Sequence, residues 1–77
     1  MLDRIRNILG EYVDVQKEQI TLETNLLKDL GLSSLDVVNI IVAFEDEFGI
    51  EIPDRKVSEI IIVEDIVRML YVEYGIE

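Results

Sequence analysis

The apolar residues of segment 34–48 recur at the spacing of an α-helix, and this pattern constrains the fold more than any other feature. Drawn at about 100° per residue, one side of the segment collects five large apolar side chains, Val37, Ile40, Ile41, Phe44 and Phe48. A face of this width is enough to pack a helix against a core. Gly49 follows directly and is typical of a helix C-terminus. We therefore predict a helix over residues 34–48 that supplies much of the core.

The same segment carries a second group of apolar residues, away from the centre of the first. We call this group the outer stripe; it consists of Leu35, Val38 and Val42. Asn39 and Asp46 flank the outer stripe on one side and Glu45 on the other. Two interpretations are open. The stripe packs inward against a long loop, or it stays exposed and binds a partner, since exposed apolar residues rimmed by charge usually mark an interaction site.

Three further segments show helical periodicity, and no segment shows the alternation that is typical of a strand. The predicted helices cover residues 2–15, 55–60 and 63–74, and a long loop covers residues 16–33. Asp54 is the expected cap of the short helix. The inner faces are expected to include Leu2, Ile5, Ile8, Leu9, Tyr12 and Val13 in the first helix and Ile66, Val67, Leu70, Tyr71 and Tyr74 in the last. Regularly placed leucines indicate that the loop packs over the core; they are Leu22, Leu26, Leu27, Leu30 and Leu32.

The length, net charge and missing residue types of the chain limit the functions that it can have. The chain has 77 residues, which suits one domain over residues 1–77, and 17 acidic against 7 basic residues give a net charge of −10. Such a chain repels nucleic acid and anionic membranes, so basic protein surfaces are the expected partners. The absence of Cys and His removes the commonest metal ligands and general base, which counts against an enzyme and a metal site. We see no signal peptide and no membrane-spanning run, and we expect a cytoplasmic monomer.

Two serines stand where the loop turns into the helix at residues 34–48. Ser33 followed by Asp36 fits a capping box, in which a serine side chain and an acidic side chain satisfy free backbone N–H groups. Ser34 would then be the first helical residue. Its hydroxyl would project near the positive end of the helix dipole, where an attached phosphate is favourably placed.

These residues resemble a known family. Segment 30–36, Leu-Gly-Leu-Ser-Ser-Leu-Asp, is similar to the attachment motif of acyl carrier proteins. The resemblance continues through Val38, residues 43–48 and residues 51–54, and covers nearly the whole chain. It implies an all-α acyl-carrier fold, a four-helix bundle with three longer helices, one short third helix and a long first loop.

The resemblance also implies a chemistry. In this family the motif serine, matched by Ser34, is esterified by 4'-phosphopantetheine, which a magnesium-dependent phosphopantetheinyl transferase takes from coenzyme A. The thiol of that arm carries acyl groups to fatty-acid, polyketide or related biosynthetic enzymes with basic docking surfaces, and the carrier itself catalyses nothing. The match places partner recognition on Ser33, Leu35, Asp36, Val38, Asn39, Val42, Glu45, Asp46 and Glu47.

Several positions depart from the family pattern. Ser33 stands where the family usually has Asp, Asn39 and Lys28 stand where acids are common, and Arg55 and Lys56 begin a helix that is normally acidic. Either these bases lie on a solvated face without a role, or they tune the chain for a particular partner. The changes together favour a specialised carrier over the housekeeping carrier of fatty-acid synthesis.

The resemblance further implies a pocket for the acyl chain between the second and third helices. The matching positions are Leu26, Phe44, Ile52, Val57, Ile60 and Ile66. Val57 and Ile66 are larger than the alanines often found there, so we expect a shallow pocket for short or polar acyl groups. In the apolar run from Ile60 to Val63, one or two residues should face outward. The run serves either core packing or contact with a partner.

Other function classes remain open at this point. A carrier of amino acids or hydroxy acids would share the site, although the acidic second helix disfavours the adenylating enzymes that serve such carriers. An acidic protein-interaction module without the prosthetic group would use the serine only as a cap. The cluster formed by Glu45, Asp46 and Glu47 cannot cage an ion, because consecutive helical residues point in different directions.

Overall fold

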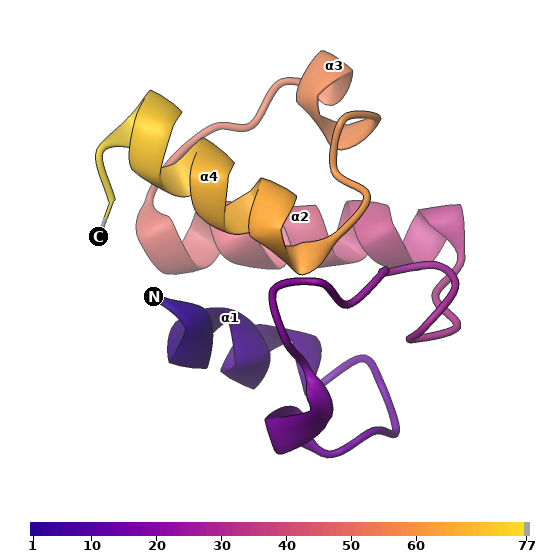
Figure 1. The fold of residues 1–77 in the computed structure, drawn as a ribbon. Helices are drawn as coiled ribbons and strands as arrows, with labels where there is room; N and C mark the ends of the chain where they lie inside the picture. The colour runs from indigo at the N-terminus through magenta and orange to yellow at the C-terminus, as the bar shows by residue number, and fades with distance from the viewer. Residues whose placement is uncertain (77) are drawn as a thin grey trace.

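The computed structural model describes residues 1–76, and these residues form an all-α fold. Its elements are α1 (Leu2–Leu9), the short 3-10 helix η1 (Lys17–Gln19), α2 (Ser34–Phe48), α3 (Asp54–Val57) and α4 (Val63–Tyr74). In Figure 1, α2 runs through the middle of the molecule, with α1 on one side and α3 on the other. The prediction of three longer helices, a short third helix and a long first loop is confirmed.

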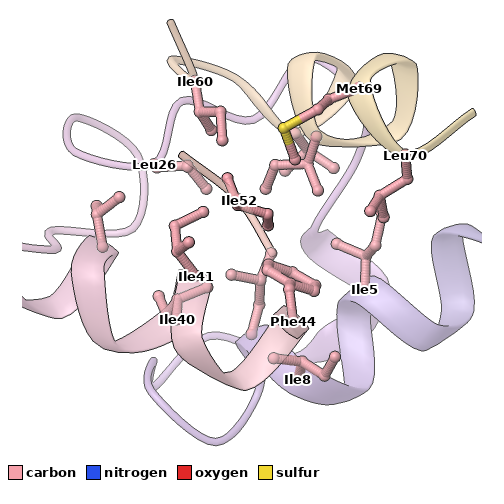
Figure 2. Close-up of a cluster of buried hydrophobic side chains, with 14 of the residues drawn as sticks. Ile5, Ile8, Leu26, Ile40, Ile41, Phe44, Ile52, Ile60, Met69 and Leu70 are labelled. Carbon is pink, nitrogen blue, oxygen red and sulfur yellow. The ribbon is translucent and has the colours of Figure 1, made fainter. Parts of the chain in front are cut away.

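The core lies where α1, α2, α4 and the connecting segments meet. Figure 2 shows Phe44 of α2 among side chains from α1 and α4, with Ile52 and Leu26 contributed by the connections. Nine side chains are almost fully buried: Phe44, Ile5, Leu9, Ile20, Leu26, Ile40, Ile66, Leu70 and Val63. The predicted inner face of α2 is buried as expected, except that Phe48 is only partly covered.

Both ends of α2 follow from local sequence. At its start, the Ser33 Oγ accepts a hydrogen bond from the Asp36 N–H at 3.2 Å, and Asp36 Oδ2 accepts one from the Ser33 N–H at 3.0 Å. This is the predicted capping box. At its end, Gly49 adopts a left-handed conformation with φ of +65°, which a residue without a Cβ does at no steric cost.

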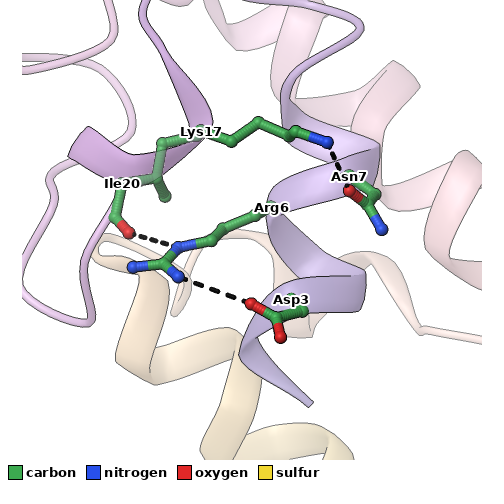
Figure 3. A network of polar contacts seen from close by, with 5 residues as sticks. All are labelled: Asp3, Arg6, Asn7, Lys17 and Ile20. Atoms are coloured by element: carbon green, nitrogen blue, oxygen red, sulfur yellow. Dashed lines mark hydrogen bonds and ion pairs between the residues drawn. The ribbon is translucent and has the colours of Figure 1, made fainter.

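Helix α1 is shorter than predicted, ending at Leu9 and not near residue 15. Gly10 lowers helix propensity, and a Cβ there would lie 3.1 Å from the Arg6 carbonyl oxygen and 3.3 Å from Lys17 Cγ, so a larger residue would require the Lys17 side chain to shift. The loop is tied back onto α1 by Arg6 Nε, which donates to the Ile20 carbonyl at 2.8 Å, and by Lys17 Nζ, which donates to Asn7 Oδ1 at 2.9 Å (Figure 3). Tyr12, predicted on the inner face, is 38% exposed because the helix has already ended.

The long loop packs over the core, as its leucines predicted. Leu26 and Leu32 are buried, whereas Leu22 and Leu27 are exposed. The loop is also hydrogen-bonded to the segment before α4: the Leu26 N–H donates to the Ile61 carbonyl at 3.1 Å and the Val63 N–H to the Thr24 carbonyl at 3.0 Å. These bonds hold the loop close to the start of α4.

Helix α3 begins and ends earlier than predicted, at residues 54–57 and not 55–60. Pro53 takes the capping position, and Asp54 is the first helical residue, so the prediction that Asp54 caps this helix was wrong. Beyond Val57 the chain continues as a turn, with the Ile60 N–H bonded to the Val57 carbonyl. No residue of α3 is buried, so little packing energy is available to extend it.

Helix α4 has the predicted limits, and Asp65 Oδ2 satisfies the N–H groups of Ile61 and Ile62 at its start, at 2.9 and 3.0 Å. Its inner face differs in one respect. Tyr71 is 59% exposed and Met69 is buried in its place. A tyrosine hydroxyl needs a polar partner or water, whereas a methionine side chain adapts to an irregular apolar gap.

Candidate functional site

Ser34 lies at the surface, on the first residue of α2. The preceding Gly31 has φ of +67°, a conformation that turns the chain, and Leu32 is buried directly after it. This anchor leaves Ser33 and Ser34 exposed at the helix start. The Ser33 side chain is used by the cap, whereas the Ser34 hydroxyl forms no hydrogen bond within residues 1–76.

A groove opens beside Ser34. It has a volume of about 480 Å³ and runs between the turn at residues 25–28, α2, and the chain from Val57 to Ile61. Its apolar lining residues are Leu27, Val37, Val38, Val57, Ile60 and Ile61. Its polar lining residues are Asn25, Lys28, Ser34 and Ser58. The groove therefore offers apolar walls to a group attached at Ser34.

The outer stripe lies next to this groove and is exposed. Leu35, Val38 and Val42 are 69%, 46% and 47% exposed, so the interpretation in which they pack inward against the loop does not hold. Asn39 and Asp46 are exposed too, as expected for residues that flank the stripe. The outer stripe and these two polar residues thus form one continuous part of the α2 surface.

The other acids named from sequence have partners inside the fold. Asp36 belongs to the capping box, and Glu45 Oε2 accepts a hydrogen bond from the Ile52 N–H at 2.7 Å. Glu47 pairs with Arg4 of α1 at 2.9 Å, and the Arg4 guanidinium lies 4.3 Å from the centre of the Phe48 ring. At about 100° per residue, Glu47 lies roughly 150° from the centre of the outer stripe. The structure therefore does not bring Glu47 together with that stripe.

The residues expected around an acyl chain do not enclose one cavity. Phe44, Leu26 and Ile66 fill the core, whereas Val57 and Ile60 line the groove beside Ser34. A second groove of about 290 Å³ lies between α2 and α3; its lining residues are Val38, Ile41, Val42, Glu45, Ile52, Asp54 and Val57. Half-buried Val57 thus lines both grooves.

Sequence reasoning missed two contributors to the groove beside Ser34. Leu27 was assigned to loop packing and is 50% exposed. Ile61, at 58% exposed, bears out the expectation that the run from Ile60 to Val63 has an outward-facing member, but nothing in the pattern identified which one. Both gather at the groove because Leu26 and Ile61 are joined by a backbone hydrogen bond.

Helix α3 contributes Val57 to both grooves and has no buried residue. Lys56 of α3 pairs with Glu73 of α4, and this hydrogen bond raises the pKa of the Lys56 ammonium above 10.5. The Tyr74 hydroxyl donates to the Glu51 carbonyl at 2.5 Å, which fixes the chain just before α3. These polar contacts substitute for the burial that α3 lacks.

Comparison with known proteins decides the family. A model of the phosphopantetheine attachment site family matches residues 3–70. The chain belongs to this family. It is 44% identical over 70 residues to the acyl carrier protein of Helicobacter acinonychis strain Sheeba, covering 91% of this chain and 90% of that protein. Acyl carrier proteins of Helicobacter pylori strains G27 and ATCC 700392 are 41% and 42% identical over the same lengths.

Family membership gives this chain the function of an acyl carrier, with 4'-phosphopantetheine as the cofactor. The residues around Ser34 fit such a group, since an exposed hydroxyl without another role opens onto an apolar groove. Within residues 1–76, no helix is both long enough and apolar enough to span a membrane. No cluster of three or more metal-binding side chains occurs in the same residues.

Proposed function

We propose that Ser34 is the residue to which 4'-phosphopantetheine is attached. The observation that carries this proposal is that the two neighbouring serines differ in their hydrogen bonds. Ser33 caps α2, so Ser34 is not needed for the fold and presents a free hydroxyl at the helix start. An interaction module that used its serine only as a cap would need Ser33 alone.

The proposed attachment is a phosphoryl transfer from coenzyme A. Ser34 Oγ forms a bond to the phosphorus that bears the pantetheine, the pyrophosphate P–O bond breaks, and adenosine 3',5'-bisphosphate leaves. The proton of the Ser34 hydroxyl passes to a base of the transferase. The product carries a phosphodiester at the start of α2, where unpaired backbone N–H groups and the helix dipole stabilise a negative charge.

The cofactor supplies a terminal thiol on which acyl groups are held as thioesters. The chain contains no Cys, so none of its own side chains competes for that role. The residues around Ser34 orient the attached arm, and the apolar walls of the groove keep water from part of it. The expectation of short or polar acyl groups rests on Val57, which lines this groove, and on Ile66, which fills the core.

The outer stripe is the proposed docking surface for partner enzymes. Leu35, Val38 and Val42 supply exposed apolar area close to Ser34, and Asp46 supplies a carboxylate for a basic partner surface. The partners in question are a phosphopantetheinyl transferase and acyl-processing enzymes. Asp36, Glu45 and Glu47 add negative potential, although their side chains already have partners within the fold.

The remaining assignments follow from these. We propose that the chain is a carrier and not an enzyme, that it acts as a cytoplasmic monomer, and that residues 1–77 form one carrier domain. The neutral Ser33 and Asn39 and the basic Lys28 support a specialised carrier, because they reduce the negative charge around Ser34.

Intact-protein mass spectrometry tests the attachment site. The protein is incubated with coenzyme A, magnesium and a broad-specificity phosphopantetheinyl transferase. We expect a mass gain of one phosphopantetheinyl group in the wild type and none in Ser34→Ala. Ser58→Ala is the matched control, because Ser58 is an exposed serine that lines the same groove. A gain in Ser34→Ala, or its loss in Ser58→Ala alone, would contradict the assignment.

A further inference from the structure

Lys28 is the one charged residue among those that line the groove beside Ser34. Its side chain is exposed and forms no ion pair with a carboxylate of residues 1–76. Three of the seven bases, Lys17, Lys28 and Arg55, form no ion pair within residues 1–76, and of these only Lys28 lines the groove. Arg4, Arg6, Lys56 and Arg68 all have acidic partners. The cation at the groove therefore lacks a counter-ion in the described protein.

The turn that carries Lys28 is fixed by hydrogen bonds. Asn25 Oδ1 accepts from the Leu27 N–H at 3.0 Å and from the Lys28 N–H at 2.9 Å. The neighbouring acid, Asp29, accepts a hydrogen bond from the Asn25 N–H at its Oδ2 at 2.8 Å and forms no ion pair with Lys28. The backbone of Lys28 is thus held in place while its long side chain stays free to reach across the apolar wall, as lysine stems commonly do.

We propose that Lys28 is a positioning residue whose ammonium group pairs with the phosphodiester formed on Ser34 and thereby directs the attached arm into this groove. The inference rests on the proposed attachment at Ser34. A phosphodiester there introduces an anion at the mouth of a groove in which Lys28 is the only charged lining residue among residues 1–76 and forms no ion pair within them. Lysine binds phosphate as a compact point charge and needs no planar geometry.

The consequence is a folded arm. The groove has about 480 Å³ and six apolar lining residues, which is within the range of sites that hold small organic ligands. With its phosphate end held by Lys28, the arm lies along Leu27, Val57 and Ile61, and its thiol is partly shielded from solvent. Partner enzymes then have to draw the arm out, and a basic group of the partner's docking surface that binds the phosphodiester in place of Lys28 gives them a means to do so.

The test uses the protein loaded with phosphopantetheine, and loading is verified by mass. Two readouts are followed: the amide chemical-shift differences between unloaded and loaded protein at Leu27, Val57, Ile60 and Ile61, and the rate at which iodoacetamide alkylates the thiol. We expect Lys28→Gln to shrink the shift differences and to raise the alkylation rate roughly two- to five-fold, the size typical of losing one exposed ion pair. Salt near 1 M should have the same effect on the wild type, because it screens charges beyond about 3 Å.

Two matched variants sharpen the result. Lys17→Gln removes the same charge from η1, which does not line this groove, and should behave as the wild type. Lys28→Arg should restore both readouts. Equal effects of Lys28→Gln and Lys17→Gln would overturn the proposal. So would an ammonium resonance of Lys28 that stays unmoved when wild-type protein is loaded, a measurement that needs no variant. Failure of the wild type to gain mass would instead contradict the attachment at Ser34.

Discussion

The two sides of α2 are built differently. Toward α1, large side chains such as Phe44, Ile5 and Leu9 are fully buried, and Arg4 covers Phe48 at the edge. Toward α3, a helix of four residues contributes no buried side chain and leaves a groove on each side. We call these the filled side and the grooved side. The filled side stabilises the fold, and the grooved side, which includes Ser34, is left with surface that a ligand or partner can use.

The largest expected effect is on the filled side. Phe44→Ala should lower the free energy of unfolding by about 3–5 kcal/mol, because Phe44 is fully buried and its removal leaves a cavity. For a domain of 77 residues this is a large share of the total stability. Urea denaturation followed by circular dichroism measures the change. A loss under about 1 kcal/mol would mean that the filled side is not the main source of stability.

Ser33 and Ser34 differ in the same way as the two sides of α2, since one supports the fold and the other is left free. Ser33→Ala removes the cap of α2 and should cost about 1 kcal/mol, whereas Ser34→Ala removes a hydroxyl without a hydrogen bond and should change the stability of unloaded protein by less than about 0.5 kcal/mol. Both variants are compared by urea denaturation without the cofactor. Equal losses would show that Ser34 also supports the helix start, which would weaken its assignment as a residue kept free for attachment.

The filled side was largely predictable from the sequence, and the grooved side was not. Apolar residues at helical spacing identified the α2 core face and most of its partners, because burial on that side follows periodicity. Tyr71 and Met69 were misplaced since both lie at the edges of the α4 inner face, where chemistry and not spacing decides burial. Tyr12 was misplaced because α1 ends at Leu9, and the following loop is tied back onto α1 by hydrogen bonds from Arg6 and Lys17, contacts that leave no periodic signal.

The same reasoning explains which parts of the candidate site could be predicted. Ser34 and the outer stripe follow from a local motif and a helical face, and the exposure of the stripe decides between the two interpretations that the sequence left open. The groove depends on Leu27 and Ile61, which meet only because the loop is hydrogen-bonded to the segment before α4. The pairing of Glu47 with Arg4 likewise joins residues 43 positions apart. Contacts of this kind cannot be read from the pattern of one segment.

A smaller effect is expected on the grooved side. Val57→Ala should lower the free energy of unfolding by at most about 1 kcal/mol, because Val57 is only half buried and loses two carbon atoms. It should, however, enlarge both grooves that Val57 lines. Loading wild type and variant with acyl groups of increasing length, and following amide shifts of Ile41 and Ile60, measures this. We expect longer chains to perturb these amides more in the variant. The same length dependence in both proteins would show that Val57 does not limit the space.

The smallest effect concerns the contact between α3 and α4. The hydrogen bond from Lys56 to Glu73 raises the pKa of the Lys56 ammonium in the folded protein above its ordinary value of 10.5. The contact therefore stabilises the fold fully at a pH below the pKa of the unfolded chain. This stabilisation is lost as the pH rises through the higher pKa of the folded protein. Lys56→Met should therefore lower the protection of α3 amides against hydrogen exchange while Lys56 is protonated, and the difference from wild type should shrink as the pH rises toward the raised pKa of Lys56. Arg55→Met is the control, because Arg55 lies on the same helix and forms no ion pair within residues 1–76. Because α3 has no buried residue, loosening this contact should leave the core amides of α2 unaffected, and slower or faster exchange at Phe44 would show that the two sides of α2 are coupled.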